Sequence, residues 1–309
     1  MWAGKWRTAM SFTNEVKAEL AALPIGGRAL LMAESYGMVL PCVDSTGTHI
    51  RLQTESADAA KRLAMLCEGL CGAPVELSML GGGYLAEVER GEGAVQRVLQ
   101  VLDIPTGVPA LRLGRALLED ADCVTAFLRG LFLSAGTASD PEKGYRLELV
   151  LRQHRLTDDL EVLLQELQLP PARTTRRLAQ VLYYKSASRV EEILRSLGAA
   201  RSADRLAQVR GRRAITNEIN RQQNSSIANI KRMAQANALQ NAALQSLQES
   251  GVLDTLPKEL QQVAQARLAN PEATLRELSG LLPGLSRSTV DRRLRRLVEL
   301  AQARMEETQ

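Results

Sequence analysis

The residues best suited to chemistry lie near the C-terminus, in the segment 286–301. In a helix that turns about 100° per residue, the apolar side chains of this segment share one face. They are Val290, Leu294, Leu297 and Ala301. The other side carries hydroxyl and guanidinium groups, which can bind base edges and phosphates of double-stranded DNA. These groups belong to Ser288, Arg292, Arg295, Arg296 and, more laterally, Thr289, and Ser286 and Arg287 at the start of the segment are further candidate contacts. The competing interpretation is an arginine-rich surface helix in a small helical bundle.

Two short helices are expected before this segment. Residues 256–268 have helical spacing, and Thr274 with Glu277 forms a capping box that begins a second helix. Pro283-Gly284 then makes a tight turn, and Ser286 caps the third helix. Two short helices joined by a glycine-containing turn, the second one basic, are typical of a helix-turn-helix.

The position of each arginine on the third helix predicts its role. Arg292 lies nearest the centre of the outer face and in the N-terminal half, the part that enters the major groove. We therefore expect Arg292 to read bases. Arg295 and Arg296 lie a turn later, where the helix leaves the groove, and we expect them to bind phosphates.

A second basic region precedes these helices. Residues 201–247 show no strand pattern and contain no proline, which indicates one or two long helices. The segment 173–232 holds 14 basic and 4 acidic residues. The candidate DNA contacts here are Asn220, Arg221, Asn224, Asn229 and Lys231. A solvated charged helix that bridges two domains is the alternative interpretation.

No pattern typical of an enzyme or of a cofactor site is present. The sequence has no nucleophile elbow, phosphate loop or dinucleotide fingerprint, and Gly81-Gly82-Gly83 is flanked by strand patterns, as in a hairpin. Cys67 and Cys71 lie four residues apart but have no second close pair, so unliganded thiols are favoured over zinc. The acidic residues 119–122 are better explained as helix capping than as a metal site. We therefore expect no metal and no cofactor.

The composition indicates a folded, predominantly helical protein. Of 309 residues 45% are hydrophobic and only 3% aromatic, so leucine, alanine, valine and isoleucine must form the core. No apolar run approaches the ~20 residues that span a bilayer, and residues 1–10 do not form a secretory signal, so a cytoplasmic protein without membrane contact is expected. The 17 basic and 11 acidic residues of 201–309 make the C-terminal part the basic one.

Residues 10–200 contain the same order of elements twice. A helix at 14–23 with Asn14 as its cap comes first, and then a helix ending at Gly37, two strands, a helix, a hairpin and a helix follow. The first of these strands is expected in the residues MVLPCV at 38–43. The same order begins again at Asp120, with a helix that ends at Gly136. This repeat predicts two αββαββα halves, at about 10–105 and 106–200.

Two segments resemble known families. FLRGLFLSAG at 127–136 is similar to the LAGLIDADG helix of homing endonucleases, whose fold is built from duplicated αββαββα halves. The stretches 220–240 and 256–297 are similar to the WhiA family of sporulation and cell-division transcription regulators, and so is MSFTNEVKAEL from Met10. The resemblance covers Met10 to Ala301. It implies that residues 1–9 are an N-terminal extension.

The resemblance implies a bacterial DNA-binding regulator whose endonuclease-like domain has lost cleavage. In the endonuclease motif, the acidic residue before the last glycine binds the catalytic metal, one from each half. With Gly37 matched to Gly136, Tyr36 and Ala135 occupy these positions, and neither offers the carboxylate oxygen that Mg²⁺ prefers. Glu34 or Asp140 could supply such an oxygen if the match is shifted, which keeps a metal-dependent endonuclease as an alternative.

The resemblance also implies contact with RNA polymerase holoenzyme and its sigma factor. The family's helix-turn-helix commonly carries Asn-His where this chain has Asp291-Arg292, a difference that bears on site preference. A further alternative is a protein-binding adaptor that touches DNA only through its tail. The expected class is α+β. Its parts are a LAGLIDADG-like domain at 10–200, an all-α basic linker at 201–250 and a helix-turn-helix domain at 251–309.

Overall fold

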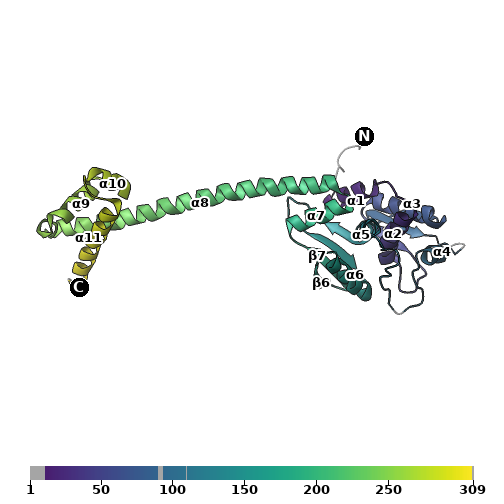
Figure 1. The fold of residues 1–309 in the computed structure, drawn as a ribbon. Coiled ribbons are helices and arrows are strands. Elements are labelled where there is room, and N and C mark those ends of the chain that lie inside the picture. The colour runs from purple at the N-terminus through teal and green to yellow at the C-terminus, as the bar shows by residue number, and fades with distance from the viewer. Residues whose placement is uncertain (1–10, 90–92, 109, 308–309) are drawn as a thin grey trace, which may run out of the picture. The chain divides into compact units, whose positions relative to one another are not determined.

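The computed structural model describes residues 11–89, 93–108 and 110–307 (Figure 1). The expected extension at 1–9 lies outside these residues. Contacts between residues divide the chain into two compact units, Met1–Arg213 and Ala214–Gln309. The segment 201–250, expected as a separate linker, is therefore shared between the two units. Among the described residues, no helix is both long and apolar enough to cross a membrane.

The N-terminal unit contains helices and two antiparallel sheets, which confirms the α+β class. Its elements are α1 (Phe12–Ala21), α2 (Arg28–Val39), η1 (Leu40–Cys42), β1 (Arg51–Thr54), α3 (Ala57–Cys71), β2 (Val75–Leu80), β3 (Gly83–Val88), α4 (Ala94–Val101), α5 (Ala121–Ala135), β4 (Gly136–Ala138), β5 (Leu147–Leu151), α6 (His154–Glu166), β6 (Ala172–Arg176), β7 (Ala179–Tyr184), α7 (Ala187–Leu197) and the start of α8 (Ala200–Glu249). The strand orders are β1-β3-β2 and β4-β5-β7-β6. Sheet order and element order therefore repeat between the halves.

Two expectations about the first half are wrong. The cap of α1 is Ser11, whose Oγ accepts from the backbone N–H of Asn14, because the helix begins at the buried Phe12. The segment 38–43 is not a strand: α2 continues to Val39, and η1 follows it. Pro41 has no N–H to give to a ladder. Only Val43 pairs, as an isolated bridge with Ile50, so the first sheet has three strands.

Helices α2 and α5 cross at the centre of the N-terminal unit (Figure 1). A Cβ at Gly37 would lie 2.0 Å from the backbone oxygen of Phe127, and a Cβ at Gly130 would lie 2.1 Å from that of Glu34. Each helix thus contributes one glycine that admits the backbone of the other. Around this crossing, apolar side chains from both halves form one continuous core.

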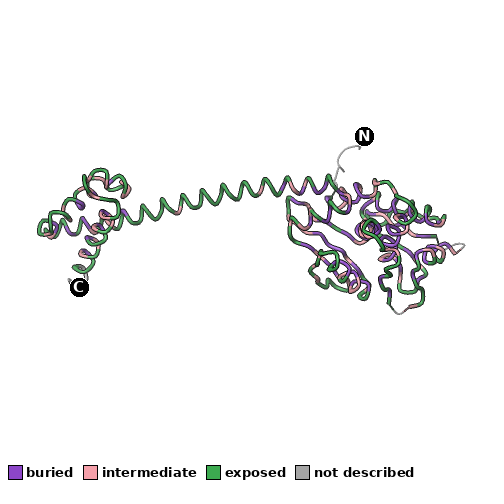
Figure 2. The backbone as a smooth tube through the Cα atoms, in the orientation of Figure 1, coloured by how far each residue is buried: buried purple, intermediate pink, exposed green. Residues whose placement is uncertain are grey.

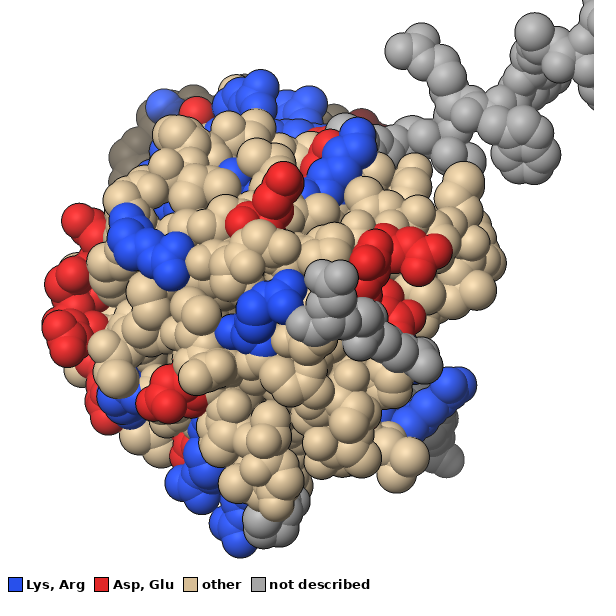
Figure 3. Space-filling view, turned by 90° about the vertical axis from the view of Figure 1, so that its right-hand side faces the viewer, with Lys and Arg blue, Asp and Glu red and all other residues tan. Residues whose placement is uncertain are grey.

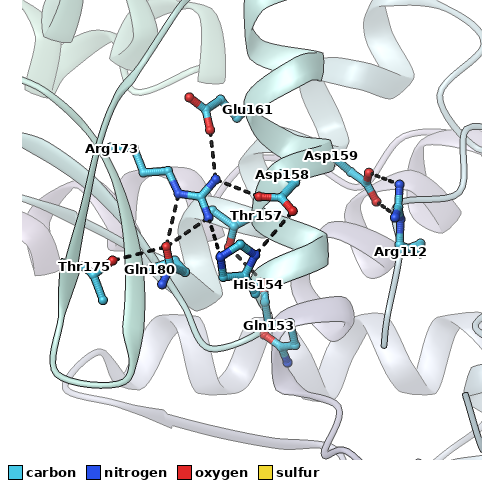
Figure 4. Close-up of polar contacts among 10 residues, drawn as sticks. All are labelled: Arg112, Gln153, His154, Thr157, Asp158, Asp159, Glu161, Arg173, Thr175 and Gln180. Carbon is cyan, nitrogen blue, oxygen red and sulfur yellow. Dashed lines mark hydrogen bonds and ion pairs between the residues drawn. The ribbon is translucent and has the colours of Figure 1, made fainter. Parts of the chain in front are cut away.

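Charged side chains attach the outer helices to the sheets. In the second half, the guanidinium of Arg173 on β6 donates to Asp158 (2.7 Å) and Glu161 (3.1 Å) of α6 and to Gln180 of β7 (Figure 4). Arg112, in the connection between the halves, forms a bidentate pair with Asp159. This network is half exposed and holds α6 on the second sheet.

The start of α8 is fixed to α1. The buried carboxylate of Glu19 accepts from the backbone N–H groups of Arg201 (2.7 Å) and Ser202 (3.0 Å) and from the Ser202 hydroxyl. These are N–H groups of the first turn, which have no partner within the helix, and the helix dipole favours a negative charge there.

The C-terminal unit packs the end of α8 with three helices. Its remaining elements are η3 (Leu253–Thr255), α9 (Lys258–Ala269), α10 (Leu275–Leu281) and α11 (Arg287–Glu307). Leu244 and Leu247 of α8 belong to the same core as Val263, Leu278 and Leu294. The middle of α8 is exposed on all sides (Figure 2).

We predict that Gly37→Ala lowers the free energy of unfolding by about 1 to 3 kcal/mol, because its methyl group meets the Phe127 carbonyl of the facing helix. The control is Gly69→Ala on α3, where the nearest atom would lie 3.8 Å away. That change should stabilise the chain by about 0.5 to 1 kcal/mol, as alanine does inside a helix. Urea denaturation followed by circular dichroism measures both. Equal effects of the two substitutions would show that the crossing is not close.

Candidate nucleic-acid interface

The helix-turn-helix is formed by α10, a short turn and α11. Thr274 caps α10 in a complete capping box with Glu277, and Ser286 Oγ accepts from the backbone N–H of Thr289 (3.2 Å) at the start of α11. The turn contains Gly284, whose φ of 84° is readily adopted only by glycine. The expected capping residues and turn are confirmed.

The inward face of α11 consists of the predicted apolar residues. Val290, Leu294 and Leu297 are fully buried, and Ala301 nearly so. Of the candidate DNA contacts in this segment, Thr289 is half-buried, and the others are exposed: Ser286, Arg287, Ser288, Arg292, Arg295 and Arg296. The rotation of the helix therefore presents one side of hydroxyl and guanidinium groups to solvent.

The arginines of α11 differ in their ion pairs. Arg295 pairs with Asp291, and Arg296 lies 3.2 Å from Glu299. Arg293, which is largely buried, pairs with Glu259 of α9. Arg287 and Arg292 have no ion-pair partner among the residues that the structure describes. These two guanidinium groups are therefore free to bind a ligand without breaking an internal contact.

Arg267 of α9 positions the segment before α10, and sequence reasoning missed it. Its side chain is fully buried, and Nη1 donates to the carbonyl of Ala273 next to the cap Thr274. Nε and Nη2 have no partner among the described residues, and burial lowers the pKa of the group. Asn241 of α8 donates to the carbonyl of Pro271 in the same segment (3.1 Å). An arginine in an amphipathic helix carries no periodic signal that would have identified it as buried.

The candidate residues of α8 are all exposed, but they do not share one stripe. At about 100° per residue, Asn220, Asn224 and Lys231 fall within about 40° of one another. Arg221 lies about 60° from Asn224, whereas Asn229 lies about 140° from it. The opposite side carries exposed isoleucines, among them Ile215 and Ile219. A largely polar and basic face therefore remains, without Asn229 and with the exposed Ile227 about 20° from Asn220.

The helix crossing corrects the match between the two halves. The two glycines at the crossing, Gly37 and Gly130, are equivalent, so Gly37 does not correspond to Gly136. Six residues after each glycine, Val43 pairs with Ile50 and Gly136 pairs with Leu149 at the start of the sheets. The residue equivalent to Ala135 is therefore Cys42 and not Tyr36. Tyr36 is buried, and its hydroxyl accepts from the backbone N–H of Gly114 (2.7 Å).

The acidic residues considered as alternative metal ligands have other partners. Glu34 is buried and accepts from Nε (2.7 Å) and Nη2 (3.0 Å) of Arg62, and Arg129 lies 3.4 Å away. Asp140 lies in the turn after β4, where its carboxylate accepts from the backbone N–H of Glu142. Among the described residues, no group of three His, Cys, Asp or Glu side chains could hold a metal ion.

A buried cation lies close to Cys42. Lys17 of α1 is 5% exposed, and burial lowers the pKa of its ammonium group to about 8. Burial also raises the pKa of the Cys42 thiol to about 12, against the attraction of Lys17. At neutral pH this position therefore holds a neutral thiol beside an ammonium group, which repels a divalent cation.

The open face of each sheet carries both acidic and basic residues, and in the second sheet Glu148 pairs with Arg146 and Arg176. On the face of the first sheet that points away from α3, Glu76 and Glu87 lie beside Arg51. Arg51 pairs with Glu87 (2.9 Å). In the second sheet, Arg146 and Lys185 lie over the ring of Tyr183, at 4.3 and 5.1 Å. Figure 3, a view from the side of α3 and α4, shows acidic and basic residues interspersed with uncharged surface. That side has no continuous basic field.

Two family models match consecutive parts of the chain. The WhiA LAGLIDADG-like domain matches residues 124–216, and the WhiA C-terminal HTH domain matches residues 219–301. A probable cell division protein WhiA of Alkaliphilus oremlandii is 30% identical over 315 residues, which cover 94% of this chain and 97% of the relative. Its counterpart from Lactococcus lactis is 31% identical, with 94% and 97% covered.

A solved structure is similar over nearly the whole length. The full-length DUF199/WhiA crystal structure from Thermatoga maritima superimposes with a TM-score of 0.58 at 27% identity and covers 95% of this chain and 98% of the other. Sequence and structure comparisons therefore agree on the same two-part organisation.

We predict that Lys17→Met stabilises the N-terminal unit at pH 7, by up to about 3 kcal/mol, since it removes the cost of burying a charge. The unfolded state keeps lysine charged to about pH 10.4, whereas the native state releases the proton near pH 8. The advantage of the variant should thus be full below pH 8 and disappear as the pH rises to about 10.5. Thermal unfolding of both proteins across this range measures the difference. A pH-independent difference would contradict the burial of a charged Lys17.

Proposed function

Because the chain belongs to the WhiA family of cell-division proteins, with a LAGLIDADG-like domain and a helix-turn-helix DNA-binding domain, we propose that it is a sequence-specific transcription regulator. In this proposal it acts at the nucleoid in cell division and sporulation and does not cut DNA. The observation that carries the proposal is the side of α11 opposite its fully buried apolar face, which bears Arg292 without an ion-pair partner among the described residues.

Arg292 is the proposed base reader. It lies in the first half of α11, the part that enters the major groove in helix-turn-helix proteins, and its guanidinium can form two hydrogen bonds to one guanine. No described acidic side chain competes for it. Ser288 and Thr289 lie at the start of the same helix, where they can reach the phosphates that flank the groove.

Arg295 and Arg296 are proposed phosphate contacts. Both are exposed and paired with acids of their own helix, Asp291 and Glu299. Exposed pairs of this kind contribute about 0 to 1 kcal/mol, so a phosphate can replace the acid at little cost. The polar face of α8, with Asn220, Arg221, Asn224 and Lys231, extends the same kind of contact, and each neutralised phosphate releases counterions.

The proposed absence of cleavage rests on four residues. Cys42 and Ala135 occupy the two equivalent positions where a metal-binding carboxylate would be needed, and Mg²⁺ prefers such oxygens. The buried ammonium of Lys17 beside Cys42 further disfavours a divalent cation. Glu34 is already paired with Arg62 and Arg129.

A regulator of this type acts through the transcription machinery. We include contact with RNA polymerase holoenzyme and its sigma factor in the proposal, on the strength of the family resemblance. The N-terminal unit offers the surface for such contact, since its first sheet is mixed in charge and not basic.

We predict that Arg292→Ala weakens binding to the specific site by about 1 to 3 kcal/mol and leaves binding to scrambled DNA nearly unchanged. Arg296→Ala is the matched control on the same side of α11 and should weaken both to a similar, smaller extent. The specific duplex comes from selection out of a random library with the full chain. Competition binding then gives the ratio of affinities. An unchanged ratio for Arg292→Ala would mean that α11 does not read sequence, in favour of the adaptor.

We predict no nicking of supercoiled DNA that carries the selected site, with either Mg²⁺ or Mn²⁺, since neither Cys42 nor Ala135 offers a carboxylate to hold the ion. Agarose gel electrophoresis separates nicked from supercoiled plasmid. The control is Glu34→Gln. Nicking by the unsubstituted chain that disappears in this variant would identify a metal-dependent endonuclease.

A further inference from the structure

The first sheet of the N-terminal unit ends in an unprotected strand. β2 pairs with β3 on one side, and none of the described strands pairs with its other side. Three of its six residues are large, apolar and exposed: Leu77 (44%), Met79 (77%) and Leu80 (49%). A free edge of this kind is a template for a further strand.

The register shows which backbone groups are free. The N–H of Glu89 donates to the carbonyl of Pro74 (3.0 Å), which makes this a hydrogen-bonded pair of the β2–β3 ladder. Since hydrogen-bonded and non-hydrogen-bonded pairs alternate in antiparallel sheets, the N–H and C=O groups of Val75, Leu77 and Met79 point away from β3. Three donors and three acceptors thus line the outer edge of β2.

The equivalent strand in the second half is protected. β6 occupies the same edge position in β4-β5-β7-β6 that β2 occupies in its own sheet. Its sequence is ARTTR, it follows Pro170-Pro171, and it carries two arginines and no large apolar residue. Basic residues and prolines are the usual means of blocking an edge. Two equivalent edges therefore differ in the property that controls strand pairing.

We propose that the edge of β2 pairs with β2 of a second copy of this chain. The strands run antiparallel about a two-fold axis at Ser78, so that each Ser78 faces the Ser78 of the other copy. Leu77 then lies opposite Met79 of the other copy, on the face of the sheet that α3 covers. Such mutual burial of the same surface is the usual form of a two-fold interface.

Charge and register favour a second copy as the occupant. Glu76 is the only charged residue of β2, and in this register it lies opposite Leu80 of the other copy. A shift that placed Glu76 opposite Glu76 would bring two like charges together across the ladder, which is unfavourable. The strand thus complements itself in backbone hydrogen bonding and keeps its one charged residue away from the same residue of the other copy. One ladder buries less than the roughly 1,200 Å² of a standard interface, so the dimer should be weak.

The test is cross-linking of the full chain through Ser78→Cys, in the absence of DNA. Directly opposed residues of a non-hydrogen-bonded pair have Cα atoms about 4.5 Å apart, within the range that a disulfide spans. In a glutathione redox buffer, the variant should form a covalent dimer at least about tenfold faster than Thr174→Cys, the matched exposed position on β6. The unsubstituted chain controls for its own four cysteines.

A second substitution separates pairing from chance collision. Met79→Lys, added to Ser78→Cys, places a charge in the apolar contact and should reduce cross-linking to the rate of Thr174→Cys. Circular dichroism verifies that each variant is folded. Equal rates for Ser78→Cys and Thr174→Cys would overturn the proposal, and so would a rate that Met79→Lys leaves unchanged. Cross-linking of Leu77→Cys with none at Ser78→Cys would overturn the stated register.

Discussion

The close approach of α2 and α5 is the contact on which the N-terminal unit depends. Gly37 and Gly130 each admit a backbone carbonyl of the opposite helix to a distance that no side chain would allow. Because each helix leads directly into the first pairing of its own sheet, at Val43 or at Gly136, the crossing sets the relation between the two sheets. The single core shared by both halves follows from it.

In the C-terminal unit, the buried face of α11 has the comparable role. Val290, Leu294 and Leu297 fix the rotation of the helix, and the exposed side follows from that rotation. Arg267 positions α10, the other helix of the motif, because it donates a hydrogen bond to the carbonyl of Ala273 just before that helix begins. Residues that do not contact the ligand thus determine which guanidinium groups are available to bind it.

Sequence patterns predicted those features that depend on neighbouring residues. The caps Ser286 and Thr274, the glycine hairpin at 81–83 and the apolar face of α11 are local in this sense, and all are confirmed. Several contacts that were missed join residues far apart in the chain, such as Glu34 with Arg62 or Glu19 with the start of α8, whereas the missed contact of Arg267 with Ala273 is local. Gly37 was interpreted as a helix end, because a glycine required for close packing and one that ends a helix have the same sequence signal.

The duplicated halves no longer carry the same edge strand. In a dimer of two identical subunits, both sheets would have the same edge strand. One edge could not then stay apolar while the other became basic. Joining the halves in one polypeptide removed this restriction, because VELSML and ARTTR are encoded separately and can change independently. Covalent fusion therefore allowed symmetry to be lost at the periphery, while the two glycines preserved it at the centre.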